Sequence, residues 1–335
     1  MIYAIQRIAF SILSLFILLL TTFLLSHVMA GDPALVAAGP NAGIAKIEAL
    51  RQQMGLDQPI FVQFGIYVGN ILQGDLGTSW FTQQPIADDL IRELPPSLEL
   101  VFLAMFINLA VSMPLGLLTA RYAHTRFDDI VRLVVMAGAG LPVFWIAILL
   151  QQIVAGNWGL LPIAGRLSFA NRGFEGATGF YLLDSLLAGN IGVFIDTLAH
   201  LVLPALALSL LFTAVGVRIT RTSMINEFRK DYVTLARAKG AGEGRIMFRH
   251  VFANGATPAL TVFGMQFGWM LGATVLVEEI FGRPGIGRYA IKAVTQSDIH
   301  AVVAVVFIVG IVFLIANLVV DILVYALSPR KQRAG

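Results

Sequence analysis

The residues with the clearest chemical role lie in a charged segment, residues 231–258, which reads DYVTLARAKGAGEGRIMFRHVFANGATP. Basic side chains and small residues are concentrated here, although Asp, Glu, Lys and Arg make up only 13% of the chain. Hydrophobic stretches flank the segment on both sides. This arrangement favours noncovalent docking to a partner outside a bilayer over chemistry that makes or breaks bonds.

The order of residues in this segment predicts two short helices joined by a turn. Asp231 belongs to a helix-capping residue type, and Tyr232–Lys239 follows with basic residues at its C-terminal end. Gly240 predicts the end of this helix, because glycine tolerates the positive φ of a C-terminal cap. Ala241–Gly244 is predicted as a turn, and Arg245–Ala253 as a second helix that leads into the next hydrophobic stretch.

Small residues on one face of the first helix favour docking. Ala236, Gly240 and Glu243 are spaced four and three residues apart, so they lie on one side of a helical segment. Small side chains there would fit a groove of another protein. The alternative is a solvated basic loop that sets the membrane orientation or touches anionic lipid. The ordered caps and glycines favour docking.

The sequence carries no motif for catalysis or for binding a cofactor. It has no cysteine, which excludes disulfides, thiolate metal sites and cysteine nucleophiles. Its five histidines show no HxxxH or HExxH spacing, and no GxxxxGK[ST] phosphate-binding loop occurs. We therefore predict a protein that is not an enzyme, holds no cofactor or metal, and does not bind ATP itself.

The elements that must position this segment are membrane helices. The chain is 57% hydrophobic, with a mean hydropathy of +0.80, and stretches long enough to cross about 30 Å of hydrocarbon recur along it. Lipid offers no hydrogen bonds to open strands, so these stretches must be helices. The first is too long for the hydrophobic part of a signal peptide, so we predict a retained helix. Six transmembrane helices are predicted: Ile8–Ala30, Leu100–Ala120, Leu133–Ile153, Thr197–Val217, Val251–Val277 and Ile299–Val320.

The distribution of charge predicts the orientation. With the N-terminus inside, the inside segments hold 15 of the 23 Lys and Arg residues. The positive-inside rule therefore places both termini in the cytoplasm. The pI of 9.3 reflects this orientation, and no nucleic-acid partner is predicted.

These spans divide the chain into three parts. Residues 1–30 are predicted as an N-terminal transmembrane helix, residues 31–96 as an external segment, and residues 97–335 as a five-helix core with a cytoplasmic coupling loop at 218–255. Pro95-Pro96 is predicted to mark the start of the second span.

Three further groups of residues invite interpretation. Gly264, Gly268 and Gly272 are spaced by four, which predicts one helix face for close helix packing. Glu278 and Glu279 end the fifth span on the outer side, where they either anchor a turn or contact an external partner. Residues 61–72 are predicted as an amphipathic helix at the membrane interface, with Tyr67 as an anchor.

The segment at 231–258 resembles the EAA loop of ABC importer permeases, most closely the first membrane subunit of the dipeptide permeases in the peptide and nickel branch. The likeness covers nearly the whole chain and includes several distant motifs in the same order. The matching residues are Tyr232-Val233-x-x-Ala236-Arg237-Ala238-Lys239-Gly240, Arg249-His250, Asn254 with Pro258, Gly31-Asp32-Pro33, Leu56-Asp57-Gln58-Pro59, Gly74-Asp75-Leu76-Gly77-x-Ser79, Arg218-x-x-Arg221-x-Ser223-Met224, Glu278-x-Ile280-Phe281-x-x-Pro284-Gly285-x-Gly287, and Asn317-Leu318-x-x-Asp321.

This resemblance implies an all-α, type I, MetI-like permease fold in the bacterial inner membrane. It implies half of a translocation pathway for dipeptides or short peptides, completed by a second, homologous permease subunit. One or two cytoplasmic ATPase subunits would use ATP and Mg, and a periplasmic or lipid-anchored binding protein would deliver the peptide. The coupling residues implied for the ATPase contact are Tyr232, Ala236, Arg237, Lys239, Gly240, Ala241 and Glu243.

The sequence departs from the family pattern at three places. Thr234 stands where the EAA consensus has Glu, Ser297-Asp298-Ile299-His300 replaces an Arg-Asp-x-Pro cluster, and Ser328-Pro329-Arg330 replaces Asp-Pro-Arg. Other substrates of the same branch stay open, namely a nickel chelate, haem or a peptide-like antibiotic. A rival from another class is an ATP-independent secondary transporter, which would need intramembrane charge pairs or an inverted repeat.

Overall fold

The computed structural model describes residues 2–29, 43–53 and 56–327. Over these residues the fold is helical, and the described chain contains no strand, only an isolated bridge between Thr78 and Pro85. The predicted all-α class is confirmed. The Gly31-Asp32-Pro33 and Ser328-Pro329-Arg330 motifs lie outside the described residues.

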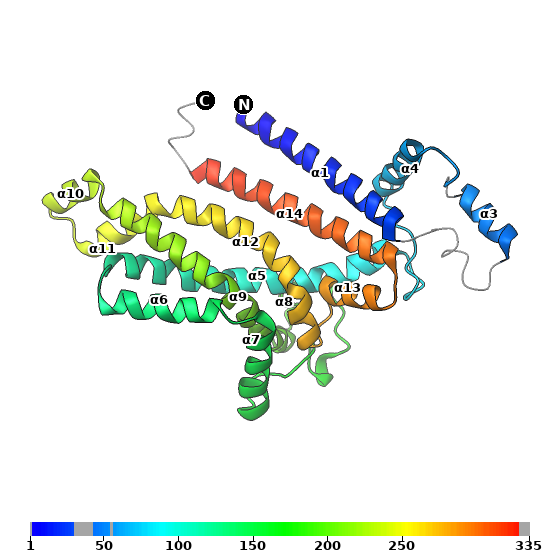
Figure 1. Cartoon of the computed structure of the whole chain (residues 1–335). Coiled ribbons are helices and arrows are strands. Elements are labelled where there is room, and N and C mark those ends of the chain that lie inside the picture. The colour runs from blue at the N-terminus through cyan, green and yellow to red at the C-terminus, as the bar shows by residue number, and fades with distance from the viewer. Residues whose placement is uncertain (1, 30–42, 54–55, 328–335) are drawn as a thin grey trace. The chain divides into compact units, whose positions relative to one another are not determined.

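Long helices alternate with short connecting helices along the chain (Figure 1). In chain order they are α1 (Ile2–Met29), α3 (Ile44–Gln53), α4 (Ile60–Leu72), α5 (Ile86–Arg121), α6 (Arg126–Ala139), α7 (Val143–Leu150), the π-helix η1 (Gln151–Asn157), the 3₁₀ turn η2 (Phe169–Asn171), α8 (Tyr181–Leu187), α9 (Ile191–Phe228), α10 (Asp231–Ala238), α11 (Glu243–Arg245), the π-helix η3 (Ile246–Phe252), α12 (Ala253–Ile280), α13 (Ile286–Thr295) and α14 (Ile299–Leu327).

The chain forms two compact units. One unit contains Met1–Leu94 and Tyr289–Leu314, and the other contains Pro95–Arg288 and Ile315–Gly335. We refer to them as the N-terminal unit and the core unit. The charged segment of residues 231–258 and the helices that hold it belong to the core unit.

Four helical stretches are long and apolar enough to cross a membrane, and α6 with α7–η1 makes a fifth if the bent pair is one span. The first predicted span is helical in α1, and among the residues whose side chains the structure describes its apolar stretch is Ala9–Leu25. Membrane-spanning helices are therefore confirmed, and the count of six stays a prediction.

The third predicted span, Leu133–Ile153, is not one straight helix. It is split between α6 and α7–η1, which meet at an angle of 98°. Gly140 caps the end of α6, and Pro142 precedes α7 with an extended backbone at φ −61° and ψ 139°. Proline lacks an N–H and disfavours a helical conformation in the residue before it, so hydrophobicity continues here while the helix does not.

The second span starts earlier than predicted. α5 already begins at Ile86, and Pro95 and Pro96 lie inside it. Asp88 and Asp89 occupy the first turn of α5, where negative charge favours the helix N-terminus. Thr82 Oγ1 also donates to the buried Asp89 carboxylate at 2.6 Å. These acidic residues, and not the proline pair, mark the start of the helix.

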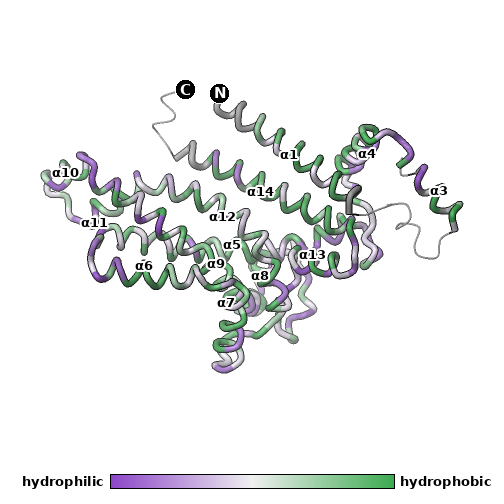
Figure 2. Tube along the Cα trace, viewed as in Figure 1, coloured by the Kyte–Doolittle hydropathy of each residue, from purple (hydrophilic) through white to green (hydrophobic). Residues whose placement is uncertain are grey.

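Within the core unit, α9 packs against α6, α7, α8 and α12. Hydrophobic residues predominate along these helices, while hydrophilic residues gather near α10 and α11 (Figure 2). The backbones approach closely at Gly216 of α9, where a Cβ atom would lie 2.6 Å from the Ser112 hydroxyl oxygen of α5. α5 and α9 therefore pack closely at this point.

A buried polar network also joins α5, α9 and α12. Asn108 donates to Gln266 at 2.8 Å, and Ser112 donates to the amide oxygen of Asn108 at 2.8 Å. Gln266 in turn donates to the Phe212 carbonyl oxygen at 3.2 Å. Lipid leaves no alternative partner for such groups, so the network fixes these three helices to one another.

The three glycines predicted for helix packing occupy different environments. A Cβ atom at Gly264 would lie 2.3 Å from Val320 Cγ2 of α14, whereas nothing lies within 4 Å of one at Gly272. Gly268 is buried within the core unit. Close packing inside this chain is therefore seen at Gly264 and is missing at Gly272.

This difference predicts unequal effects of the same substitution. Gly264→Leu should lower the melting temperature of the purified chain, because overpacking costs on the order of 1–3 kcal/mol. Gly272→Leu is the matched control and should leave the melting temperature nearly unchanged. Equal destabilisation by both variants, measured by thermal unfolding in detergent, would show that the α12–α14 contact is not as described.

Candidate coupling site

The candidate site is the segment of residues 231–252 that follows α9, named the cytoplasmic segment after its predicted orientation. Glu227 near the end of α9 is buried and accepts hydrogen bonds from Lys230 Nζ and from Tyr232 Oη. α10 begins at Asp231, and the residue before it, Lys230, makes no side-chain cap. Asp231 is thus the first helical residue and not the predicted cap. Its charge still suits the helix N-terminus.

Gly240 ends α10 as predicted. Its φ of +80° is a left-handed conformation that side chains with a Cβ atom rarely adopt. Gly240 N–H donates to the Arg237 carbonyl at 2.9 Å, and Ala241 N–H donates to the Ala236 carbonyl at 3.0 Å. This pair of bonds is a Schellman motif, which satisfies the last carbonyl groups of the helix.

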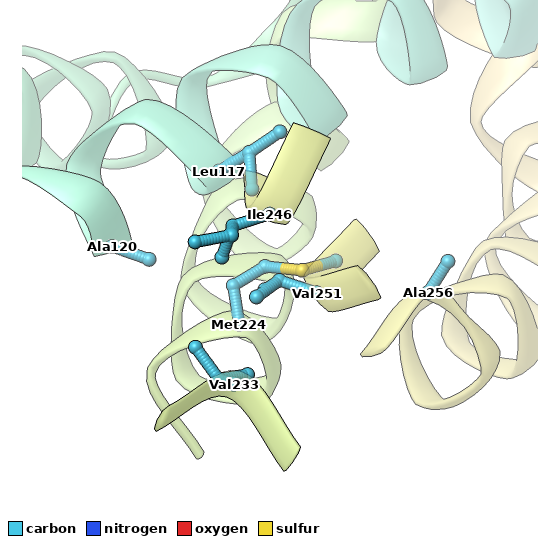
Figure 3. Close-up of a cluster of buried hydrophobic side chains, with 7 residues drawn as sticks. All are labelled: Leu117, Ala120, Met224, Val233, Ile246, Val251 and Ala256. Carbon is cyan, nitrogen blue, oxygen red and sulfur yellow. The ribbon is translucent and has the colours of Figure 1, made fainter. Parts of the chain in front are cut away.

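An apolar cluster holds the cytoplasmic segment onto the core helices (Figure 3). Val233 of α10 and Ile246 of η3 are fully buried against Met224 of α9 and Leu117 of α5. The complete cluster is Leu117, Ala120, Met224, Val233, Ile246, Val251 and Ala256. The segment is therefore a packed extension of α5, α9 and α12 and not a solvated loop.

This packing divides the predicted coupling residues into two groups. Tyr232, Ala236 and Ala241 pack against the apolar cluster of their own chain, so of the small face predicted to seat in a partner's groove only Ala236 is turned inward. Outward-facing residues predicted for the site are Arg237, Lys239, Gly240 and Glu243. Those four remain available to a partner.

The outward face also contains two large apolar side chains that were not predicted from the sequence. Leu235 is 54% exposed and Phe248 is 62% exposed. A signal for Leu235 was present, because Val233 and Leu235 are two residues apart and point to opposite sides of a helix. Once Val233 is assigned to the core, Leu235 must be at the surface.

Glu243 ties the segment to the end of α5. Its carboxylate lies 3.0 Å from Arg237 Nε and 3.2 Å from Arg121 Nη2. All three side chains are substantially exposed, so salt screens these pairs. The two ion pairs of Glu243 orient the segment, while the apolar cluster stabilises it.

At the other end of the core unit, Glu278 and Glu279 have different roles. Glu278 is fully buried, accepts from the Ser97 hydroxyl at 2.6 Å, and accepts from the Arg288 N–H at 3.1 Å. A Cβ atom at Gly285 would lie 2.3 Å from its carboxyl carbon. Glu279 is 48% exposed beside Arg288. Of the predicted pair, only Glu279 presents an exposed carboxylate.

A second buried carboxylate, Glu99 of α5, was not anticipated. Its Oε2 atom accepts from Arg166 at 3.0 Å and from Arg283 at 2.8 Å, and its Oε1 atom accepts from the Leu182 N–H at 2.8 Å. Arg166 also stacks on the Tyr181 ring at 3.5 Å. Three segments that are predicted to be external therefore meet at Glu99.

Burial lowers the pKa of Arg283 to about 10, and the nearby Glu99 carboxylate opposes this shift. The guanidinium thus stays charged at neutral pH. Its charge needs Glu99, because an uncompensated charge is unfavourable in a buried site.

Removing this carboxylate should destabilise the external end of the core unit. Glu99→Ala removes the carboxylate that pairs with Arg166 and with the fully buried Arg283, and breaking a buried ion pair costs on the order of 3–5 kcal/mol. Thermal unfolding of the purified chain measures the loss. Glu279→Ala removes an exposed carboxylate and is the control. The assignment is wrong if the two variants unfold at the same temperature.

The sequence matches two families of transport proteins. Residues 112–333 match the family described as binding-protein-dependent transport system inner membrane component. Residues 1–101 match the N-terminal family of the same membrane components. Together the two matches cover nearly all of the chain.

Curated relatives are similar over nearly their whole lengths. The probable D,D-dipeptide transport system permease protein DdpB of Escherichia coli K12 is 38% identical over 94% of this chain and 92% of that protein. The di/tripeptide transport system permease protein DppB of Pseudomonas aeruginosa UCBPP-PA14 is 36% identical over 97% of each chain. The dipeptide transport system permease protein DppB of Alkalihalophilus pseudofirmus is 34% identical over 98% of each.

The fold is also found in a solved transporter. A chain of the inward-facing methionine ABC transporter MetNI matches with a TM-score of 0.53 and 14% identity, over 72% of this chain and 96% of that one. The predicted type I importer permease fold is confirmed. The chain therefore belongs to the inner-membrane permease components of binding-protein-dependent ABC transport systems.

Proposed function

We propose that this chain is one of two permease subunits of an ATP-driven importer of dipeptides or short peptides. The substrate class is supported by three relatives whose names specify D,D-dipeptide, dipeptide or di/tripeptide transport. The chain contributes half of the translocation pathway, and a second homologous permease supplies the other half. It performs no catalysis of its own.

The coupling role is supported by one observation, that the cytoplasmic segment has one face packed on the membrane helices and one face exposed. Its inner face is packed on α5, α9 and α12 through Val233 and Ile246, and its outer face exposes Leu235 and Phe248. A partner that binds the outer face can displace the membrane helices, because the inner face leaves little freedom between the segment and those helices. We assign the partner as a cytoplasmic ATPase dimer that uses ATP and Mg.

The remaining partners follow from the predicted orientation in the bacterial inner membrane, with both termini in the cytoplasm. A periplasmic or lipid-anchored binding protein delivers peptide to the external end of the core unit, where Glu279 is exposed. Because a separate receptor selects the cargo, a nickel chelate, haem or a peptide-like antibiotic is the alternative substrate.

The docking surface can be tested at Leu235. Leu235→Glu places a charge in an apolar contact, so ATPase co-purification and ATP-driven peptide uptake should fall by at least about tenfold, the effect of 1.4 kcal/mol. Thermal stability of the isolated chain should not change, since the side chain is exposed. Val233→Ala is the matched control, two residues away and buried. It should lower stability by about 1–3 kcal/mol.

Undiminished ATPase binding by Leu235→Glu would exclude this surface as the docking site. Peptide uptake by vesicles that contain the permease subunits without any ATPase would instead support the secondary transporter.

The orientation is tested separately by labelling single cysteines, since the chain has none of its own. Ala177→Cys and Lys239→Cys introduce thiols at exposed positions of the external and cytoplasmic segments. In intact spheroplasts a membrane-impermeant maleimide should label Ala177→Cys and not Lys239→Cys. The reverse pattern would invert the orientation.

A further inference from the structure

The helix α4 of the N-terminal unit has no charged residue on any side. Between Asp57 and Asp75 the sequence runs for 17 residues, 58–74, without Asp, Glu, Lys or Arg. The largest exposed side chains of α4 are apolar, with Phe61 85% exposed and Leu72 81% exposed. A water-exposed external helix would not be expected to carry such a surface.

One face of α4 packs on α1 through aromatic side chains. The Phe64 ring lies 5.9 Å from Phe16 and 5.2 Å from Phe23, measured between ring centroids. Tyr67 lies 5.6 Å from Phe23, and its hydroxyl donates to Thr22 Oγ1 at 3.0 Å. Figure 1 shows α4 beside the C-terminal part of α1. Tyr67, which the sequence suggested as an anchor in the headgroups, is turned toward α1 instead.

The contact residues on α1 give the depth of α4. The apolar part of α1 ends at Leu25, before Ser26 and His27, and each residue adds about 1.5 Å along a helix. Thr22 and Phe23 therefore lie about 3–5 Å below the end of this apolar part, and Phe16 lies about 13 Å below it. A helix that touches all three lies at the level of the hydrocarbon. The 13 residues of α4 extend only about 20 Å, too short to cross the bilayer.

We propose that α4 is embedded in the lipid and that acyl chains cover its exposed apolar face. The leaflet is the one at the C-terminal end of α1, which is the outer leaflet in the predicted orientation. The exposed apolar side chains of α1, including Phe10, Leu13 and Ile17, continue the same lipid-facing surface. The inference depends on α1 crossing the membrane and does not depend on the substrate or the ATPase.

Lipid explains this surface better than a protein partner does. A protein interface has an apolar centre inside a polar, hydrated rim, whereas α4 has no charge anywhere between its two ends. Gly65 and Gly69 also have nothing within 4 Å of a Cβ position. Fluid acyl chains fill such shallow grooves without shape complementarity.

Nitroxide accessibility on the full-length chain in phosphatidylethanolamine–phosphatidylglycerol vesicles tests the proposal. A nitroxide at Phe61→Cys should collide with oxygen, which concentrates in lipid, and not with a water-soluble nickel chelate. Gln58→Cys is the matched control, exposed three residues earlier beside Asp57, and should show the opposite preference. Accessibility of Phe61→Cys to the nickel chelate would place α4 in water. Protection from both reagents would mean that protein covers it. Either result overturns the proposal.

A second variant distinguishes lipid from protein without a probe. Gly65→Leu adds a large side chain where the structure has open space, so the amount of chain inserted in membranes and its oligomeric mass should stay as in the wild type. Loss of a subunit from the purified assembly, at normal expression of this chain, would show that α4 lies in a tight protein interface and would refute lipid burial.

Discussion

The burial of Val233 and Ile246 against Met224 and Leu117 is the contact on which the rest of the core unit depends. A basic segment between two membrane helices would ordinarily be a mobile, hydrated loop. Here a small apolar cluster removes that freedom, and the Gly240 cap allows the chain to reverse direction over the cluster. The exposed ion pairs of Glu243 contribute orientation, because water and salt weaken them. A force that a bound partner applies to the exposed face of α10 would thus be transmitted to α5, α9 and α12 through packed side chains.

At the end of the core unit that is predicted to be external, buried carboxyl groups take the place of an apolar cluster in holding the segments together. Glu99 and Glu278 are buried carboxylates whose partners are distant in sequence: Arg166 and Arg283 from two connecting segments for Glu99, and Ser97 of α5 for Glu278. Because a buried charge requires complete pairing, each carboxylate determines the path of a loop. The glycines at 285 and 287 follow from this requirement, since Cβ atoms there would lie 2.3 Å from the Glu278 carboxyl carbon and 2.4 Å from Val275 Cα. The glycine-rich turn after α12 is therefore held closely around the Glu278 side chain and is not a flexible turn.

Features of the fold that depend on local sequence were predictable. Hydrophobic length located the membrane helices, and Gly240 located the end of α10. Features that depend on a tertiary partner were not. The partial burial of Ala236 and the exposure of Leu235 depend on which face of α10 meets α9. The burial of Glu278 depends on Ser97, far away in the chain. The break at Pro142 was missed for another reason, because hydropathy measures composition and is insensitive to backbone direction.

The placement of polar groups in the core unit has a consequence for movement. The Asn108–Ser112–Gln266 network lies on the three helices that also meet the apolar cluster. In hydrocarbon these hydrogen bonds have no water to replace them, so separating α5 from α12 at that level leaves amide groups unsatisfied. The bend between α6 and α7 has no comparable constraint in its connecting residues, Gly140, Leu141 and Pro142, of which Gly140 and Pro142 disfavour a helix and Pro142 is extended in conformation. A movement that starts at the cytoplasmic segment should therefore shift α5, α9 and α12 together. The accompanying change in backbone angle should occur at the break between α6 and α7.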